Sequence, residues 1–110
     1  MRLGRLRDKV AVQQVNEIDN GRGGRKPGTP PWLTMREVWA EIIPLRGDEA
    51  LRNAVQRSVQ LWRVTMRPFP GLTAKHRFLW GDIVLAIKSP PAPTELRDGI
   101  VMTCESGAGS

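Results

Sequence analysis

The chain has 110 residues, of which 40% are hydrophobic and 25% charged, and its formal net charge is +6 at pH 7. This length suits one domain with a single modest core, and the composition predicts a folded soluble domain rather than a disordered tail. No apolar run approaches the roughly 18 residues of a membrane span, and one cysteine, Cys104, excludes an internal disulfide framework. No apolar segment follows the basic N-terminus, so we expect a protein that is made and kept in the cytoplasm.

The positive charge is concentrated in one continuous stretch. Residues 50–81 carry six Lys or Arg and no acid, whereas residues 1–49 carry nine bases and seven acids. Such a field suits nucleic acid or an acidic protein surface. A solvated basic face that only keeps the protein soluble has the same composition.

The chain begins with a basic N-terminal segment, residues 1–6. A first strand is expected from Arg7 to Val15, in which Val10 and Val12 share one face. The segment Asn16–Leu33 that follows contains four glycines and three prolines. Such a composition predicts a long Gly/Pro-rich loop rather than regular structure. Loops of this length in a small domain are usually functional or disordered. The loop carries Arg22, Arg25 and Lys26, and Trp32 closes it as an anchor at the rim of the domain.

The best alternating pattern of the sequence lies between Arg36 and Gly47. Apolar and polar residues alternate there, which predicts a half-buried strand. Pro44 cannot donate to a strand ladder, so we expect the strand to end at this residue. The inward face has Val38, Ala40 and Ile42, and the outward face has Glu37, Trp39 and Glu41.

Further elements follow this strand. Apolar residues at helical spacing predict one short helix over Asp48–Val55. The others are strands at Ser58–Arg67 and Gly99–Glu105, a hairpin of Lys75–Trp80 and Ile83–Lys88 that turns at Gly81–Asp82, and a Pro-rich connection at Ser89–Asp98. The residues expected to be buried together are Val38, Ile42, Trp62, Val64, Phe78, Trp80, Leu85 and Met102. Alternation in the hairpin also places Ile83 inside.

These elements predict an all-β domain over residues 7–105, followed by a short tail at residues 106–110. About six short strands with turn signals between them are typical of a small antiparallel β-barrel. Closure of the sheet leaves few edges free to pair with other chains.

The sequence contains no constellation of catalytic or metal-binding residues. His76 is the only histidine and Cys104 the only cysteine, and each falls in a strand pattern. A Cys–His pair could form across the fold, but a packed thiol and a histidine at the rim explain the same residues more simply. Two such residues are too few for a zinc site, and Gly21–Gly24 lacks the signature of a phosphate loop. We therefore expect no enzymatic activity, no cofactor and no metal.

A collinear set of short motifs spans nearly the whole chain. The motifs are G-R-L-R-D-K-V at Gly4–Val10, V-W-A-E-I at Val38–Ile42, P-L-R-G at Pro44–Gly47, W-R-V-T-M-R at Trp62–Arg67, W-G-D-I at Trp80–Ile83, and a C-terminal strand that ends in C-E. In their order and spacing they resemble phage head–tail joining proteins, also called head-completion or stopper proteins. Tailed phages, prophages and phage-derived gene transfer agents are all eligible sources of such a chain. Each motif is only a strand signature, so the set as a whole carries the resemblance.

The resemblance implies a structural virion protein that is made in the bacterial cytoplasm and located at the head–tail junction. It implies a small β-barrel that assembles into a homo-oligomeric ring, a dodecamer, between the portal and adaptor proteins and the tail terminator or tail tube. Packaged double-stranded DNA would pass through the ring without sequence-specific contacts. The ring would join the head to the tail and help to retain the DNA, away from any membrane.

Two sets of residues are candidates for these contacts. The family uses the connection between Gly47 and Ser58 near the channel, so Arg52 and Arg57 are candidate DNA-channel residues. The alternative is a helical turn that plugs the end of the barrel, with both arginines solvated. Candidates for contact with a neighbouring subunit or another partner are Arg22, Arg25, Lys26, Trp32, Trp39 and Ile43.

The alternative function is a stand-alone small β-barrel module that binds single-stranded nucleic acid. Such a module presents aromatic and basic side chains together on one exposed face. The outward face of the third expected strand carries Arg63 and Arg67 but no aromatic residue. The residues therefore favour the virion role.

Overall fold

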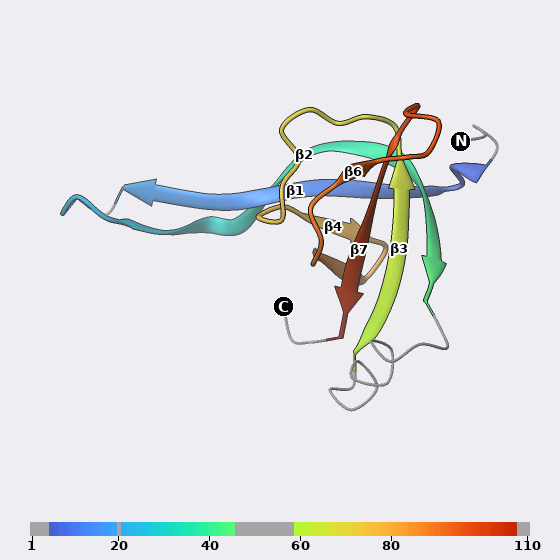
Figure 1. The fold of residues 1–110 in the computed structure, drawn as a ribbon. Coiled ribbons are helices and arrows are strands. Elements are labelled where there is room, and N and C mark those ends of the chain that lie inside the picture. Colours follow the sequence, from blue (N-terminus) through green and yellow to red (C-terminus); the bar gives the residue numbers. More distant parts are fainter. Residues whose placement is uncertain (1–4, 20, 46–58, 108–110) are drawn as a thin grey trace.

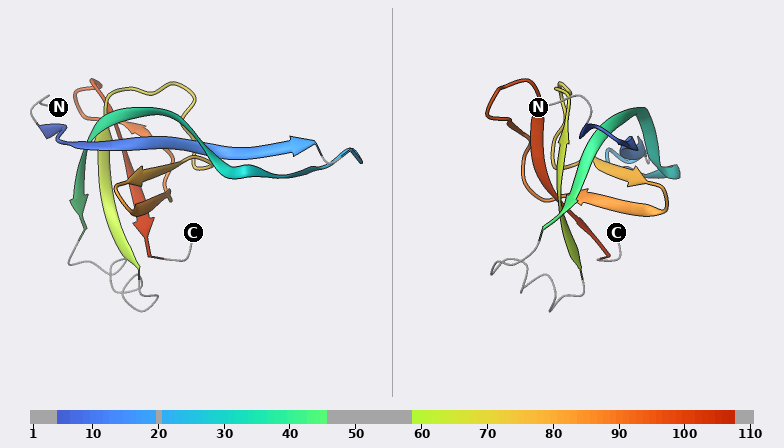
Figure 2. Two further views of the ribbon diagram at one scale, coloured as in Figure 1. Left: turned by 180° about the vertical axis from the view of Figure 1, so that it is seen from behind. Right: turned by 90° about the vertical axis from the view of Figure 1, so that its right-hand side faces the viewer.

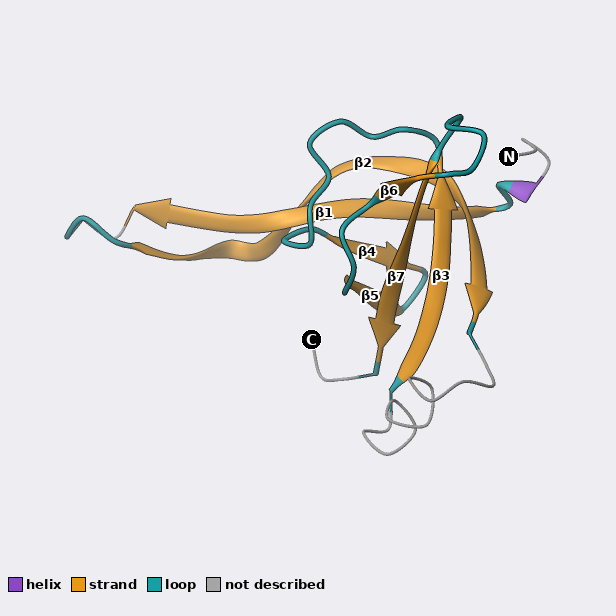
Figure 3. Cartoon of the chain, viewed as in Figure 1, coloured by secondary structure: helices purple, strands orange, loops and turns teal. Residues whose placement is uncertain are grey.

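The computed structural model describes residues 5–19, 21–45 and 59–107. In these ranges the protein is built from strands (Figures 1 and 3). The strands are β1 Asp8–Asp19, β2 Arg25–Pro44, β3 Gln60–Met66, β4 Arg77–Trp80, β5 Ile83–Ile87, β6 Ala92–Pro93 and β7 Ile100–Ser106. The short helix expected at Asp48–Val55, and with it Arg52 and Arg57, lies outside the described residues.

The strands form one antiparallel sheet that closes on itself (Figure 2). Its order is β3-β2-β1-β4-β5-β7-β6, and an additional pairing of β3 with β7 completes the ring. This seam runs from Gln60↔Ser106 to Met66↔Ile100, so it spans the full length of both strands. The prediction of a small antiparallel barrel is confirmed, with β6 as a short extra strand beside the start of β7.

Alternate residues of the strands fill the interior of this sheet. On β2, Ala40 and Ile42 are buried while Trp39 is exposed, as the alternation predicts. The expected core is confirmed: Ile42, Val64, Phe78, Leu85 and Met102 are buried together, and Val38, Trp62 and Trp80 pack against them, partly buried. Ile83 was placed wrongly by the alternation: it is exposed because it follows directly on the turn at Gly81 and Asp82.

The segment Asn16–Leu33 is not the loop that its composition predicts. β1 and β2 continue through it as a two-stranded ribbon that projects from the barrel (Figures 1 and 2). We call this ribbon, residues 14–19 and 21–35, the arm. Its pairing extends to Asp19↔Arg25, and the longest dimension of the molecule is 47 Å.

The glycines and prolines of the arm occupy positions that a hairpin tolerates. Gly21 and Gly23, at the tip, have positive φ angles of 79° and 81°, which a turn can require and glycine adopts without strain. Pro30 and Pro31 fall where the register of β2 with β1 is interrupted, between Val15↔Trp32 and Glu17↔Pro27, and no third strand pairs with β2 at these residues or at Pro27. The composition rule failed because it does not distinguish an edge strand from a loop.

Two irregularities interrupt the pairing of β1 with β2. They lie between Val12 and Gln13 and between Val15 and Glu17. At the first, Val12 pairs with Arg36 and Gln13 with Thr34, so Met35 of β2 is the extra residue and has no partner on β1. The side chain of Gln13 is buried although strict alternation predicts it outside.

Candidate assembly surface

The base of the arm is held by a polar contact with the barrel. Arg77 of β4 donates a 2.8 Å hydrogen bond from Nε to Oε1 of Gln13, and Gln13 donates one of 3.2 Å from Nε2 to Oγ1 of Thr34. The guanidinium carbon of Arg77 also lies 4.1 Å from the centre of the Trp32 ring. Desolvation lowers the pKa of Arg77, but a guanidinium stays charged at neutral pH.

A second contact joins the two strands of the arm further out. Asn16 Nδ2 donates a 2.7 Å hydrogen bond to the carbonyl oxygen of Pro30. Gly28 lies beneath this side chain, where an added Cβ would be 2.5 Å from Asn16 Nδ2. Glycine at position 28 therefore leaves the space that Asn16 occupies.

The arm carries much of the exposed apolar surface of the described residues. Seven large hydrophobic residues are exposed in the described part of the chain, and four of these seven lie on the arm. Exposed apolar side chains gathered on one element are typical of interaction sites on soluble proteins. The four are Val15, Ile18, Leu33 and Met35, with exposed fractions of 42%, 45%, 39% and 44%.

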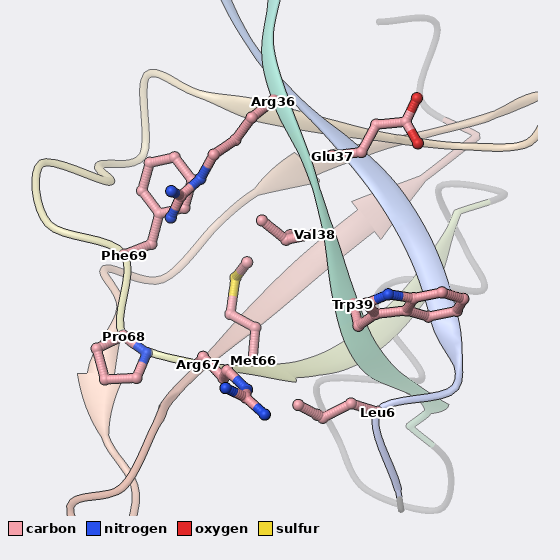
Figure 4. Close-up of a pocket in the computed structure, with 9 residues that line it drawn as sticks. All are labelled: Leu6, Arg36, Glu37, Val38, Trp39, Met66, Arg67, Pro68 and Phe69. Carbon is pink, nitrogen blue, oxygen red and sulfur yellow. The ribbon is translucent and has the colours of Figure 1, made fainter. Parts of the chain in front are cut away.

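A groove of about 520 Å³ lies where β2 and β3 diverge (Figure 4). β3 pairs with β2 only from Ala40 to Pro44, so in the described structure no strand lies opposite the β2 edge at Arg36–Trp39. Pro68, just after β3, cannot continue the ladder, and the chain turns away. The groove lies between this edge and the segment after β3, and its apolar side chains are Leu6, Val38, Met66 and Phe69.

The charges at the groove are mainly basic. The guanidinium carbon of Arg36 lies 4.3 Å from the centre of the Phe69 ring, and Arg67 is exposed at the rim (Figure 4). Glu37 also lines the groove, but its Oε2 is held 3.2 Å from Nζ of Lys9. An extended segment with apolar and acidic side chains would complement such a groove.

The residues predicted for subunit contacts do not form one patch. Arg22 lies at the tip of the arm and Arg25 and Lys26 begin β2, so these three lie close together, all exposed. Trp32 is half-buried against Arg77 at the base of the arm. Trp39 is 53% exposed, with Nζ of Lys9 5.8 Å from its ring centre, and Ile43 is half-buried near the other end of β2.

Sequence reasoning missed the apolar part of this surface. Leu33 and Met35 continue the alternation of β2 backwards, but Pro30 and Pro31 made the region read as a loop. Arg67 directly follows β3 and lies in the acid-free stretch, and this run of bases was the signal in the sequence for a basic rim. Nothing in the sequence indicated that Phe69 returns to the core.

The described residues do not assemble a catalytic site. Nδ1 of His76 accepts a 3.2 Å hydrogen bond from the backbone N–H of Thr73. Cys104 lies in the core, where burial raises the pKa of its thiol to about 12 and keeps it from acting as a thiolate. No group of three potential metal ligands occurs in residues 5–19, 21–45 and 59–107. No helix in the same ranges has the length and apolar character needed to cross a membrane.

The aromatic residues do not form a platform for base stacking. Trp39 is the one exposed aromatic side chain among the described residues, and the other three tryptophans are half-buried. Phe69 and Phe78 are buried. Successive bases need several exposed rings along a basic groove, so this arrangement does not favour a single-strand binding module.

Comparison with known proteins identifies similar sequences and folds. The sequence profile of the family described as phage head completion protein matches residues 1–107. The solution structure of a protein from Shigella flexneri 2a is 23% identical, covers 100% of both chains and has a TM-score of 0.75. A chain in the virion of a native gene transfer agent particle is 19% identical, covers 93% of both chains and has a TM-score of 0.61. No curated protein matches the sequence.

Proposed function

This chain belongs to the phage head completion protein family, and from that premise we propose that it joins the head to the tail as a ring around the DNA channel. The protein is a structural component of the virion with a role at the phage head, and it is not an enzyme. The proposal adds a homo-oligomeric ring, a dodecamer, between the portal and adaptor proteins and the tail terminator or tail tube. The ring would also help to retain packaged double-stranded DNA.

The projecting arm is the observation that best supports assembly. A subunit that acted alone would gain nothing from four exposed apolar side chains on a ribbon outside its barrel. Ring subunits need such surface on opposite sides, because each contacts two neighbours. We propose that the arm, with Arg22, Arg25 and Lys26 near its tip, is a subunit contact, and that Trp39 and Ile43 contribute to partner surfaces. Trp32 supports the arm from its base.

Retention of DNA is supported by the charge of the sequence. Arg52 and Arg57 begin the acid-free stretch at residues 50–81, and repetition around a ring would place them in circular belts of positive charge. Such belts attract phosphate without reading sequence, and salt weakens the attraction. We propose Arg52 and Arg57 as DNA-channel residues.

Deletion of the gene in the producing host tests the head–tail role. Particles that lack the protein should keep full-length tails and heads that are filled or leaking, and the two should stay unjoined in electron micrographs. Expression of the chain from a plasmid should restore joined particles. Normal joined particles in its absence would show that the protein does not join head to tail.

A further inference from the structure

The arm is a ribbon of only two strands, with free edges. β4 covers β1 only at Ala11–Gln13, and β3 covers β2 only from Ala40 onwards. Among the described residues, nothing pairs with the outer edge of β1 beyond Gln13. A two-stranded ribbon is marginally stable in water, and a free strand edge is a template for pairing with another chain.

The two edges of the arm are not equivalent. On β2 the N–H groups are missing at Pro27, Pro30 and Pro31, which prevents a continuous ladder there. β1 has no proline between Asp8 and Asp19, so it keeps the donor of every residue. Prolines on an edge strand commonly prevent it from pairing with other chains, and β1 has no such prolines. The edge at Gln14–Ile18 is therefore the one that can accept or join another strand.

The groove beside β2 offers the complementary edge. The β2 backbone at Arg36–Trp39 pairs with β1 on one side, while its other side faces the groove. The apolar side chains of Leu6, Val38, Met66 and Phe69 line the space that a further strand would occupy (Figure 4). Strand addition of this kind takes its affinity from backbone hydrogen bonds and its specificity from side-chain pockets.

Charge and apolar character match between the β1 edge and the groove. The edge carries exposed Val15 and Ile18 beside exposed Glu17, and the groove has an apolar lining with exposed Arg67 at its rim. Among the described residues, neither Glu17 nor Arg67 has an ion-pair partner. We propose that the β1 edge of one copy lies along the β2 edge in the groove of the next copy, with Glu17 facing Arg67.

This contact uses two different surfaces of the same chain. Such a heterologous contact does not close in a pair, and it generates a ring when the rotation between copies closes. The inference rests on the proposed ring and deepens it, because it assigns the two surfaces through which neighbours join. It also explains why one chain carries both the arm outside the barrel and the groove beside β2.

Chemical cross-linking in assembled particles tests the contact. Double variants of the chain, expressed in the deletion host, would carry Arg67→Cys together with Val15→Cys or Glu17→Cys. Purified particles would be treated with a short bis-maleimide reagent and analysed on a denaturing gel. Native Cys104 is fully buried, so the introduced thiols are the ones that react. A ladder of covalent multimers is expected, and dimers alone would overturn the heterologous arrangement.

A matched control and a separate failure criterion accompany this experiment. Asp82 is exposed on the turn between β4 and β5, away from the proposed contact. The control variant, Asp82→Cys with Arg67→Cys, should therefore give no ladder of multimers. Particles that contain the double variants and join heads to tails, but give no ladder with either arm position, would overturn the arm contact alone. Joined particles in the complete absence of the protein would overturn the proposed function instead.

Charge reversal gives a second test that does not depend on cross-linking. Like charges at close range oppose binding, so Glu17→Arg and Arg67→Glu should each lower incorporation into particles by at least about tenfold. The double variant should restore it. Both residues are exposed, so the free chains should fold alike, with unchanged melting temperatures as the check. Unaffected single variants, or a double variant as poor as the singles, would contradict the proposed pair.

Discussion

Arg77 lies with its guanidinium carbon 4.1 Å from the centre of the Trp32 ring, and its Nε donates a 2.8 Å hydrogen bond to Gln13. Gln13 belongs to β1 and Trp32 to β2, so one side chain of the barrel binds both strands of the arm at its base. We expect the direction in which the arm leaves the barrel to depend on this contact.

Replacement of Arg77 should therefore loosen the arm and destabilise the protein. Arg77→Met removes a charged hydrogen bond and a cation–π contact, and we expect a loss of about 2 kcal/mol in the free energy of unfolding. Urea denaturation measures the loss. Arg63→Met is the matched control, because Arg63 is exposed on β3 and its replacement should cost less than about 0.5 kcal/mol. Equal losses at the two positions would argue against the contact.

Trp62 should be far more important for stability than Trp39. Its Nε1 donates a 2.9 Å hydrogen bond to Oγ of Ser106, and its ring meets that of Trp80 edge to face at 5.5 Å. Trp62→Ala should cost about 3–5 kcal/mol, whereas Trp39→Ala, at an exposed site, should cost less than about 1 kcal/mol. A Trp62→Ala variant that melts like the parent would contradict the packing at the seam.

Protease protection should reveal whether the arm is covered in particles. Arg22, Arg25 and Lys26 are exposed near the tip, so trypsin should cut the free protein there first. In assembled particles the same bonds should be spared. Cleavage after Arg63, which lies within the closed sheet, should remain slow in both states. Equal cleavage of the arm in free protein and particles would mean that nothing covers it.

Reversal of charge at Arg52 and Arg57 should weaken DNA retention. If these residues line a channel, the double variant Arg52→Glu and Arg57→Glu should still assemble but lose DNA more readily. Added salt should narrow the difference from wild type, because it screens the attraction in both. Lys75→Glu with Lys88→Glu changes the net charge equally and serves as control. Normal retention at low salt would mean that Arg52 and Arg57 do not face the DNA.

Stability should fall at alkaline pH because of Cys104. Burial raises the pKa of its thiol from 9.0 to about 12, so the folded state disfavours the thiolate that the unfolded chain forms. The contribution of this group is full below pH 9.0 and is lost as pH rises towards about 12. Denaturant midpoints measured across this range should fall more steeply for wild type than for Cys104→Ala. Parallel curves would show that the thiol does not contribute.

The sequence predicted the barrel well because its strands are half-buried. On β2 and β3, residues such as Ala40, Val64 and Met66 alternate with polar ones, and burial of one face imposes that pattern. The pattern failed at Gln13, which is buried and lies beside an irregularity in the pairing of β1 with β2. Bulges depend on pairing between strands, and a single strand's sequence does not reveal them.

The arm could not be recognised because neither of its faces has a continuous core beneath it. Without burial, the choice of residues on the arm reflects turn chemistry and edge protection, which resemble those of a loop. The groove was equally hidden, since it arises where β3 leaves β2 after Met66 and where Phe69, distant from β2 in sequence, folds back. Such a site follows from the path of the chain rather than from any motif.

The seam between β3 and β7 determines when the barrel can form during synthesis. It pairs Trp62 with Cys104, and the hydrogen bond from Trp62 to Ser106 joins residues 44 positions apart. Contacts so distant in sequence form late, because the entropy of closing the intervening chain opposes them. A nascent chain on the ribosome therefore leaves the outer edge of β3 bare until β7 has emerged. Stalled or truncated products would be aggregation-prone, which makes complete translation a condition for entry into the particle.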